Sequence, residues 1–162
     1  MERISQSQVA VVRQGPDAAI EALYRAEFVG MVRLAYTLIG SNSEAEEIVQ
    51  DSFVEISQRF AELRQPGAYL RSVVVSRCRS ALRHRRIVGQ HPPTRPADLS
   101  PEAESLWDVL ERLPEHQRVA VVLRYYSGYR ASEIATLTDQ PASSVRSHLR
   151  RALGAMRKEI TQ

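Results

Sequence analysis

The chain has 162 residues, of which 43% are hydrophobic and 25% charged, and it contains one cysteine. This length allows one ordinary domain or two small ones, and a single cysteine excludes an intramolecular disulfide or a cysteine-based structural zinc site. The longest apolar run, Val119 to Leu123, is far shorter than the roughly 18 residues of a membrane span. The N-terminus has no signal-peptide core, so we expect a cytoplasmic protein.

The net charge of +3 conceals an alternation of acidic and basic segments. Residues 16–62 hold three basic and nine acidic residues, whereas residues 63–97 hold eight arginines and no acid. Residues 98–117 are acidic again, and residues 118–162 hold eight basic residues against three acids. The alternation predicts a polyanion at some surfaces and a different partner at others. All but one of the 22 basic residues are arginine, whose planar fork suits phosphate and guanine.

Apolar residues at helical spacing predict three helices in the first half of the chain, over residues 17–39, 43–63 and 68–86. Ser43 and Glu46 have the spacing of a capping box at the start of the second helix. Four shorter helices are predicted in the second half, and no strand pattern occurs. They span residues 102–112, 115–127, 131–138 and 142–159.

The fold class expected is therefore all-α, with two small helical domains joined by a proline-containing linker. The boundaries we expect are an N-terminal tail over 1–15, a first domain over 16–87, a linker over 88–101 and a second domain over 102–162. Domains of this size have modest cores, so either one can depend on a partner for full stability.

Residues 131–153 have the spacing of a helix-turn-helix. Its second helix has a buried stripe and, opposite to it, a polar face with Ser143, Ser147 and three arginines, which are Arg146, Arg150 and Arg157. Such a face fits the major groove, where its first residues reach base edges and its arginines also hold phosphates. The alternative is an amphipathic helix whose basic face is only solvated.

The third helix combines serines and arginines on its polar face, within 35 residues that hold no carboxylate, which suits a phosphate track. Phe60 and Tyr69 lie at either end of the preceding loop and could support an unstacked base. The alternative is that both rings are core residues, and for Phe60, which lies on a buried stripe, this alternative is favoured. The second helix instead exposes Glu47, Gln50, Asp51 and Glu55. Because acids repel DNA, this face is either a protein interface or simply solvated.

Several motifs resemble bacterial RNA polymerase sigma factors. The segment AEEIVQDSF at 45–53 resembles the polymerase-binding motif of sigma region 2. Four further segments resemble region 4, at 113–118, 123–128, 133–135 and 145–151. Regions 2 and 4 with only a short linker between them resemble the extracytoplasmic-function (ECF) group, and the resemblance covers nearly the whole chain.

The resemblance implies partners and roles for particular residues. The partners are core RNA polymerase, through its β′ clamp helices and β flap, promoter DNA and an anti-sigma factor, and no membrane insertion is expected. The clamp-helix contacts fall on Glu47, Gln50 and Asp51. The −10 contacts, made to melted DNA with a flipped base, fall on Arg71, Ser72, Ser76, Arg79, Ser80 and Arg83. The −35 contacts fall on Ser143, Ser144, Arg146, Ser147, His148, Arg150 and Arg151.

The chain departs from the usual residues of the family at four of these motif positions. Ser76 stands where asparagine is common and Ser80 where aspartate is frequent, and serine makes fewer directed hydrogen bonds. His148 replaces a frequent arginine or lysine. Asp139 replaces the usual turn glycine, and aspartate tolerates a left-handed backbone better than most residues.

Two other classes of function compete with this interpretation. A stand-alone helix-turn-helix regulator needs only residues 131–153 and leaves the motif at 45–53 without a role. An enzyme acting on nucleic acid needs a reactive cluster, but the four histidines are scattered and no metal-ligand spacing occurs. Cys78 lies on a predicted buried stripe. We therefore expect no catalytic residue, no metal site and no cofactor.

Overall fold

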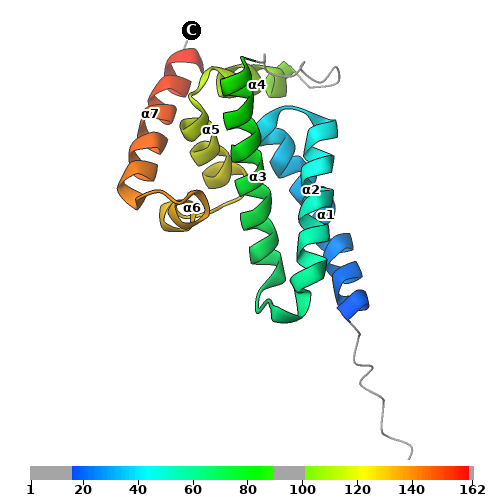
Figure 1. Cartoon of the computed structure of the whole chain (residues 1–162). Coiled ribbons are helices and arrows are strands. Elements are labelled where there is room, and N and C mark those ends of the chain that lie inside the picture. Colours follow the sequence, from blue (N-terminus) through cyan, green and yellow to red (C-terminus); the bar gives the residue numbers. More distant parts are fainter. Residues whose placement is uncertain (1–15, 90–100, 161–162) are drawn as a thin grey trace, which may run out of the picture.

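The computed structural model describes residues 16–89 and 101–160. Within these ranges the chain is helical and contains no strand, which confirms the all-α prediction (Figure 1). The elements are α1 (Pro16–Ile39), α2 (Asn42–Arg59), the 3₁₀ turn η1 (Phe60–Glu62), α3 (Pro66–Val88), α4 (Pro101–Arg112), α5 (Glu115–Val121), the π-helical turn η2 (Val122–Tyr126), α6 (Ala131–Thr138) and α7 (Ala142–Ile160). The tail predicted over 1–15 and most of the linker lie outside the described residues.

Helices α1, α2 and α3 pack pairwise into the first unit. Their facing stripes are aliphatic, and each helix contributes side chains with almost no exposed surface, including Leu38, Ile56 and Val74. Burying such side chains away from water is the main force that holds three helices of this length together. Cys78 is also fully buried and free, and burial raises the pKa of its thiol to about 12, so it is a core residue.

The start of α2 differs from the capping box predicted at Ser43. Gly40 ends α1 in a left-handed conformation with φ 75°, so one extended residue is enough to reverse the chain. That residue is Ser41, whose hydroxyl accepts a hydrogen bond from the Glu44 amide at 3.4 Å. Glu46 accepts instead from the Asn42 side chain at 2.9 Å. The predicted cap was therefore wrong by two residues.

The second unit comprises α4 to α7, in which α7 packs against both α5 and α6. The sequence predicted one helix over 115–127, but α5 widens into the π turn η2, where the Ser127 amide donates to the Val122 carbonyl at 3.2 Å. The turn after α6 places Asp139 at φ 51°, a left-handed conformation that aspartate accepts where glycine is more usual.

The two units pack against each other. Helix α6 contacts α3, and η2 contacts α1. The Trp107 indole of α4 stacks on the Tyr36 ring of α1, with ring centroids 5.3 Å apart and an interplanar angle of 21°. In Figure 1, α5, α6 and α7 accordingly lie along one side of α3, and α4 lies at its C-terminal end.

Two substitutions on α2 test the assignment of its buried face. Replacing Ile56, which is fully buried, with alanine is expected to lower the free energy of unfolding by about 2–5 kcal/mol, because it removes buried methylenes and leaves a cavity. The matched change Val54→Ala, at a site 57% exposed on the same helix, should cost less than about 0.5 kcal/mol. Urea unfolding followed by circular dichroism measures both, and equal losses would contradict this packing.

Candidate nucleic-acid and partner interfaces

The outward face of α7 forms an open basic surface. Arg146, Arg150 and Arg151 are exposed and form no ion pair within the described part of the chain, whereas Val145 is buried against the rest of the second unit. Ser143, near the N-terminus of α7, is exposed as well, and Ser144 and Ser147 are half-buried. Unpaired guanidinium groups beside short hydroxyl side chains suit contacts to both phosphates and base edges.

His148 does not share the open environment of these arginines. Its ring lies against His116 of α5, with ring centroids 4.4 Å apart, and its Nδ1 is buried without a hydrogen-bond partner. Burial lowers the pKa of His148, and the neighbouring His116 and Arg151 lower it further. Both effects favour the neutral form of this imidazole at the contact between α5 and α7.

The predicted −10 residues of α3 fall into two groups. Ser76, Ser80 and Arg83 are exposed, whereas Arg71, Ser72 and Arg79 are half-buried. The guanidinium of Arg71 donates to Glu27 of α1 at 3.0 Å, and its charge is felt by the half-buried Tyr129 of the second unit. Packing within the first unit therefore engages Arg71 at the N-terminal end of this surface and leaves Ser76, Ser80 and Arg83 open.

The acidic face of α2 is also divided. Glu47 and Gln50 are exposed and have no partner within the described residues. Asp51 and Glu55 both pair with Arg77 of α3, at 3.6 Å and 3.0 Å. Only part of this face is therefore available without breaking an internal ion pair.

The two aromatic residues beside the loop before α3 are occupied within the first unit. Phe60 packs against the core cluster. The Tyr69 hydroxyl accepts from Arg59 at 2.9 Å and donates to Glu55 at 3.2 Å, while the Arg59 guanidinium lies 5.5 Å from the ring centroid. In this conformation both rings are part of the protein's own packing.

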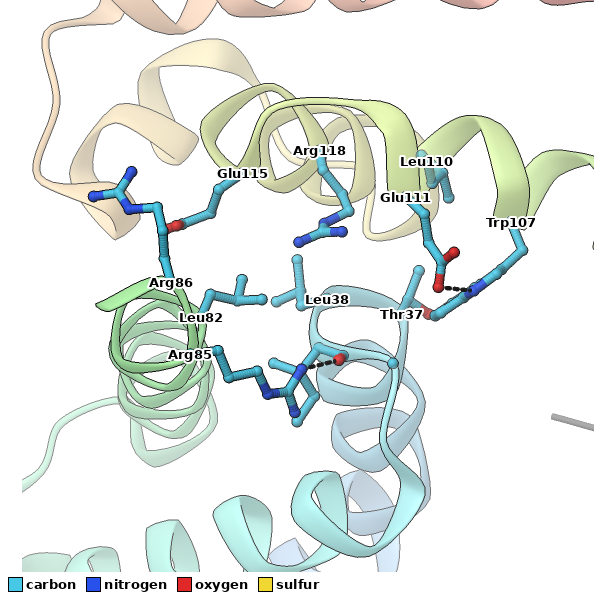
Figure 2. Close-up of a pocket in the computed structure, with 12 residues that line it drawn as sticks. Thr37, Leu38, Leu82, Arg85, Arg86, Trp107, Leu110, Glu111, Glu115 and Arg118 are labelled. Atoms are coloured by element: carbon cyan, nitrogen blue, oxygen red, sulfur yellow. Dashed lines mark hydrogen bonds between the residues drawn. The ribbon is translucent and has the colours of Figure 1, made fainter. Parts of the chain in front are cut away.

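Sequence reasoning missed a cavity of about 260 Å³ between the two units (Figure 2). Arg85 and Arg86 of α3, Arg118 of α5 and Trp107 of α4 line it. Arg118 belongs to a motif that the sequence singled out, but no role was assigned to it. The sequence held one indication that Arg118 faces inward. It lies four residues before Val122, and residues four apart on a helix share one face, which here is buried.

Within the described residues, no three histidine, cysteine, aspartate or glutamate side chains are grouped to hold a metal ion. In the same part of the chain, no helix combines the length and apolar character of a membrane span.

Comparison with known proteins agrees with this architecture. Residues 23–87 match the family Sigma-70 region 2, and residues 103–156 match Sigma-70, region 4. The probable RNA polymerase sigma factor RfaY of Xanthomonas campestris pv. campestris is 27% identical over 148 residues, which cover 80% of this chain but 37% of that protein. The RNA polymerase sigma-E factor of Streptomyces coelicolor is 29% identical over 140 residues, covering 80% of this chain and 79% of that protein.

The ECF RNA polymerase sigma factor SigL of Mycobacterium tuberculosis is 27% identical and covers 90% of both chains. Among solved structures, the sigma factor RpoE in complex with the anti-sigma factor NepR from Bartonella quintana has a TM-score of 0.72 at 17% identity, covering 88% of this chain and 97% of that one. CnrH in complex with the cytosolic domain of CnrY has a TM-score of 0.68 at 19% identity, covering 91% and 90%. This chain belongs to the sigma-70 family, as a sigma factor of the ECF group with regions 2 and 4.

The half-buried imidazole of His148 generates a prediction about pH. Because the folded state lowers the pKa of His148, the unfolded chain binds more protons as the pH falls from 7.5 to 5.5, and the free energy of unfolding decreases. His148→Gln removes this contribution, so the loss of Tm between these pH values should be smaller than in the wild type. Differential scanning calorimetry measures it, with the exposed His84→Gln as the control that keeps the full loss. An undiminished loss in His148→Gln would refute the assignment.

Proposed function

We propose that this chain binds core RNA polymerase and directs it to promoters by reading −10 and −35 elements, without catalytic activity of its own. The observation that carries the proposal is the pairing of an open acidic surface on α2 with open basic surfaces on α3 and α7, in the two segments that match sigma regions 2 and 4. A stand-alone regulator would need only the second segment. We place the protein in the cytoplasm, where polymerase and DNA are.

The polymerase contact is assigned to Glu47, Gln50 and Asp51 on α2. Glu47 and Gln50 stand exposed, so they can meet a basic partner surface directly. Asp51 lies beside them but is 3.6 Å from Arg77, so its share of the contact competes with this internal ion pair. We assign this surface to the β′ clamp helices, and we expect region 4 to meet the β flap.

The −10 contact is assigned to the polar face of α3, with Ser76, Ser80 and Arg83 as its open part. Serines here offer short hydroxyl groups, and arginines supply the phosphate contacts. Arg71 can join this surface once it leaves Glu27, and Ser72 and Arg79 flank it. A base unstacked from melted DNA costs a few kcal/mol, which these contacts must offset.

The −35 contact is assigned to the first turns of α7. Ser143, Ser144, Arg146 and Ser147 would reach base edges, and Arg150 and Arg151 would hold phosphates. We expect His148 to act indirectly, by fixing α7 against α5 through His116, because its ring is turned to that contact.

Promoter binding requires the two units to separate. The −10 and −35 elements lie about 25 base pairs apart, which is roughly 85 Å along duplex DNA at about 3.4 Å per base pair. In this structure α6 contacts α3, so the two DNA-binding surfaces belong to one packed body. We infer that the described arrangement is a closed form and that it opens when polymerase is bound.

We further propose an anti-sigma partner for this chain. Two of the solved structures with this fold are complexes of RpoE with the anti-sigma factor NepR and of CnrH with the cytosolic domain of CnrY. Such a partner would cover the surfaces assigned above to polymerase and DNA. Co-purification from the native host would recover it as a stoichiometric subunit.

Reconstituted transcription tests the function. Mapping transcript starts after overexpression in the host identifies the promoter elements, and core polymerase plus this chain should then initiate at those promoters in vitro. Glu47→Lys should weaken binding to core polymerase about tenfold, roughly 1.4 kcal/mol, because it reverses an exposed charge of the proposed contact. The control Glu21→Lys reverses an exposed charge on α1, outside the proposed contact, and should leave the binding to core polymerase unchanged. Failure to initiate, or equal binding by both variants, would overturn the proposal.

A second substitution tests the −35 surface. Arg146→Ala should cost about 1–3 kcal/mol of promoter-binding free energy and relax the base preference at one −35 position, because it removes an exposed guanidinium from the base-reading turn. Arg112→Ala, which removes an exposed arginine paired with Glu159 outside the proposed DNA surface, should leave the preference unchanged. Run-off transcription from promoters mutated at each −35 position measures both, and an unchanged preference in Arg146→Ala would exclude this residue from base reading.

A further inference from the structure

Arg118 of α5 lies at the contact between the two regions. Its side chain points into the cavity, toward Leu38 of α1 (Figure 2). The walls opposite to α5 come from region 2 and also include Leu82 and Arg85 of α3. The surroundings of this guanidinium therefore depend on whether region 4 is packed on region 2.

The closed packing leaves polar atoms without partners at this contact. Within the described residues, three buried side-chain nitrogen or oxygen atoms have no hydrogen-bond partner. Two of them lie here, namely the Nε of Arg118 and the hydroxyl oxygen of Tyr36, whose ring stacks on Trp107. A buried donor without an acceptor opposes the state that buries it, and it does so more strongly when it belongs to a charged group.

The charges around Arg118 divide between the two regions. Burial lowers its pKa most strongly, Glu115 and Glu111 raise it, and Arg85 lowers it. Glu111 and Glu115 belong to region 4, so they stay beside Arg118 when the regions separate. Enclosure by region 2 and repulsion from Arg85 act only while the regions are packed together. The unfavourable effects on this guanidinium are therefore specific to the closed form.

We propose that Arg118 is a conformational control residue whose enclosed charge destabilises the closed form and keeps region 4 from locking onto region 2. The stack of Trp107 on Tyr36 draws the regions together, and the enclosed guanidinium offsets part of that gain. When the regions separate, water reaches Arg118 and satisfies its donors. The same side chain is thus well accommodated in the open form and disfavoured in the closed form.

An uncharged side chain at position 118 reverses this balance. Arg118→Met keeps an unbranched chain in the cavity, and replacing an enclosed charge with an apolar side chain of similar volume is often stabilising. The substitution also leaves Glu111 and Glu115 as the charges of the region 4 wall, opposite the basic end of α3. Both effects favour closure, so we expect the ratio of closed to open molecules to rise about tenfold.

The consequence for transcription rests on the opening inferred under the proposed function. Closed molecules must open before they engage polymerase and both promoter elements. Arg118→Met should therefore weaken the apparent binding to core polymerase in the same proportion as it raises the closed population.

The chain provides its own reporter of closure, because Trp107 is its one tryptophan and stacks on Tyr36 across the contact. Acrylamide quenching of Trp107 fluorescence in the full-length protein is followed through a urea titration, with circular dichroism recorded in parallel. We expect Arg118→Met to move the midpoint of Trp107 exposure to a higher urea concentration. Arg118→Gln, which is also uncharged, should move it in the same direction and covers the case in which methionine disturbs α5. Midpoints equal to or below the wild-type value in both variants would overturn the proposal.

Two controls separate the enclosed charge from other effects of substitution. Arg118→Lys retains a positive charge at the same position and should not raise the midpoint. Lys158→Met removes one positive charge from an exposed position on α7 and should leave the midpoint unchanged. A rise in either control equal to that of Arg118→Met would also contradict the proposal. These titrations contain neither polymerase nor DNA, so their outcome is separate from that of the transcription assay.

Discussion

The packing of region 4 on region 2 sets a favourable aromatic stack against the unfavourable partial burial of a cation. Trp107 stacks on Tyr36 across the interface, and Arg118 is enclosed between α5 and the ends of α1 and α3. The stack supplies apolar burial, whereas enclosing Arg118 with an unpartnered Nε opposes closure. A contact built from one favourable and one unfavourable element holds the regions together without locking them, which is consistent with the opening proposed above.

The structure shows which charges of the acidic segments are neutralised within the protein and which are not. Part of the acidic segment at 16–62 is neutralised internally, through Arg77 with Asp51 and Glu55, and the remainder stays available to a partner. The acidic segment at 98–117, for which the sequence suggested no partner, places Glu111 and Glu115 in the cavity opposite the basic end of α3. It therefore balances charge between the two regions.

Local patterns anticipated most of the helices, because apolar periodicity and turn residues act over a few positions. They failed where a neighbouring residue or a changed hydrogen-bond register decided the outcome. Ser41 rather than Ser43 caps α2 because Gly40 reverses the chain immediately before it, and the predicted helix over 115–127 ends in a π turn. His148 falls on α7, the helix proposed to read DNA, yet its ring packs on His116, a contact between residues 32 positions apart.

The sequence by itself determined the all-α class, the helix-turn-helix, the alternating charges and the motifs of sigma regions 2 and 4, because each depends on residue spacing within one segment. Only the tertiary structure decided which charged side chains remain open. It paired Asp51 with Arg77 and Arg71 with Glu27, and it left Glu47 and Arg146 exposed. It also placed Arg118 of region 4 in one cavity with the end of α3. Burial and charge neutralisation depend on neighbours distant in the chain, and no local pattern records them.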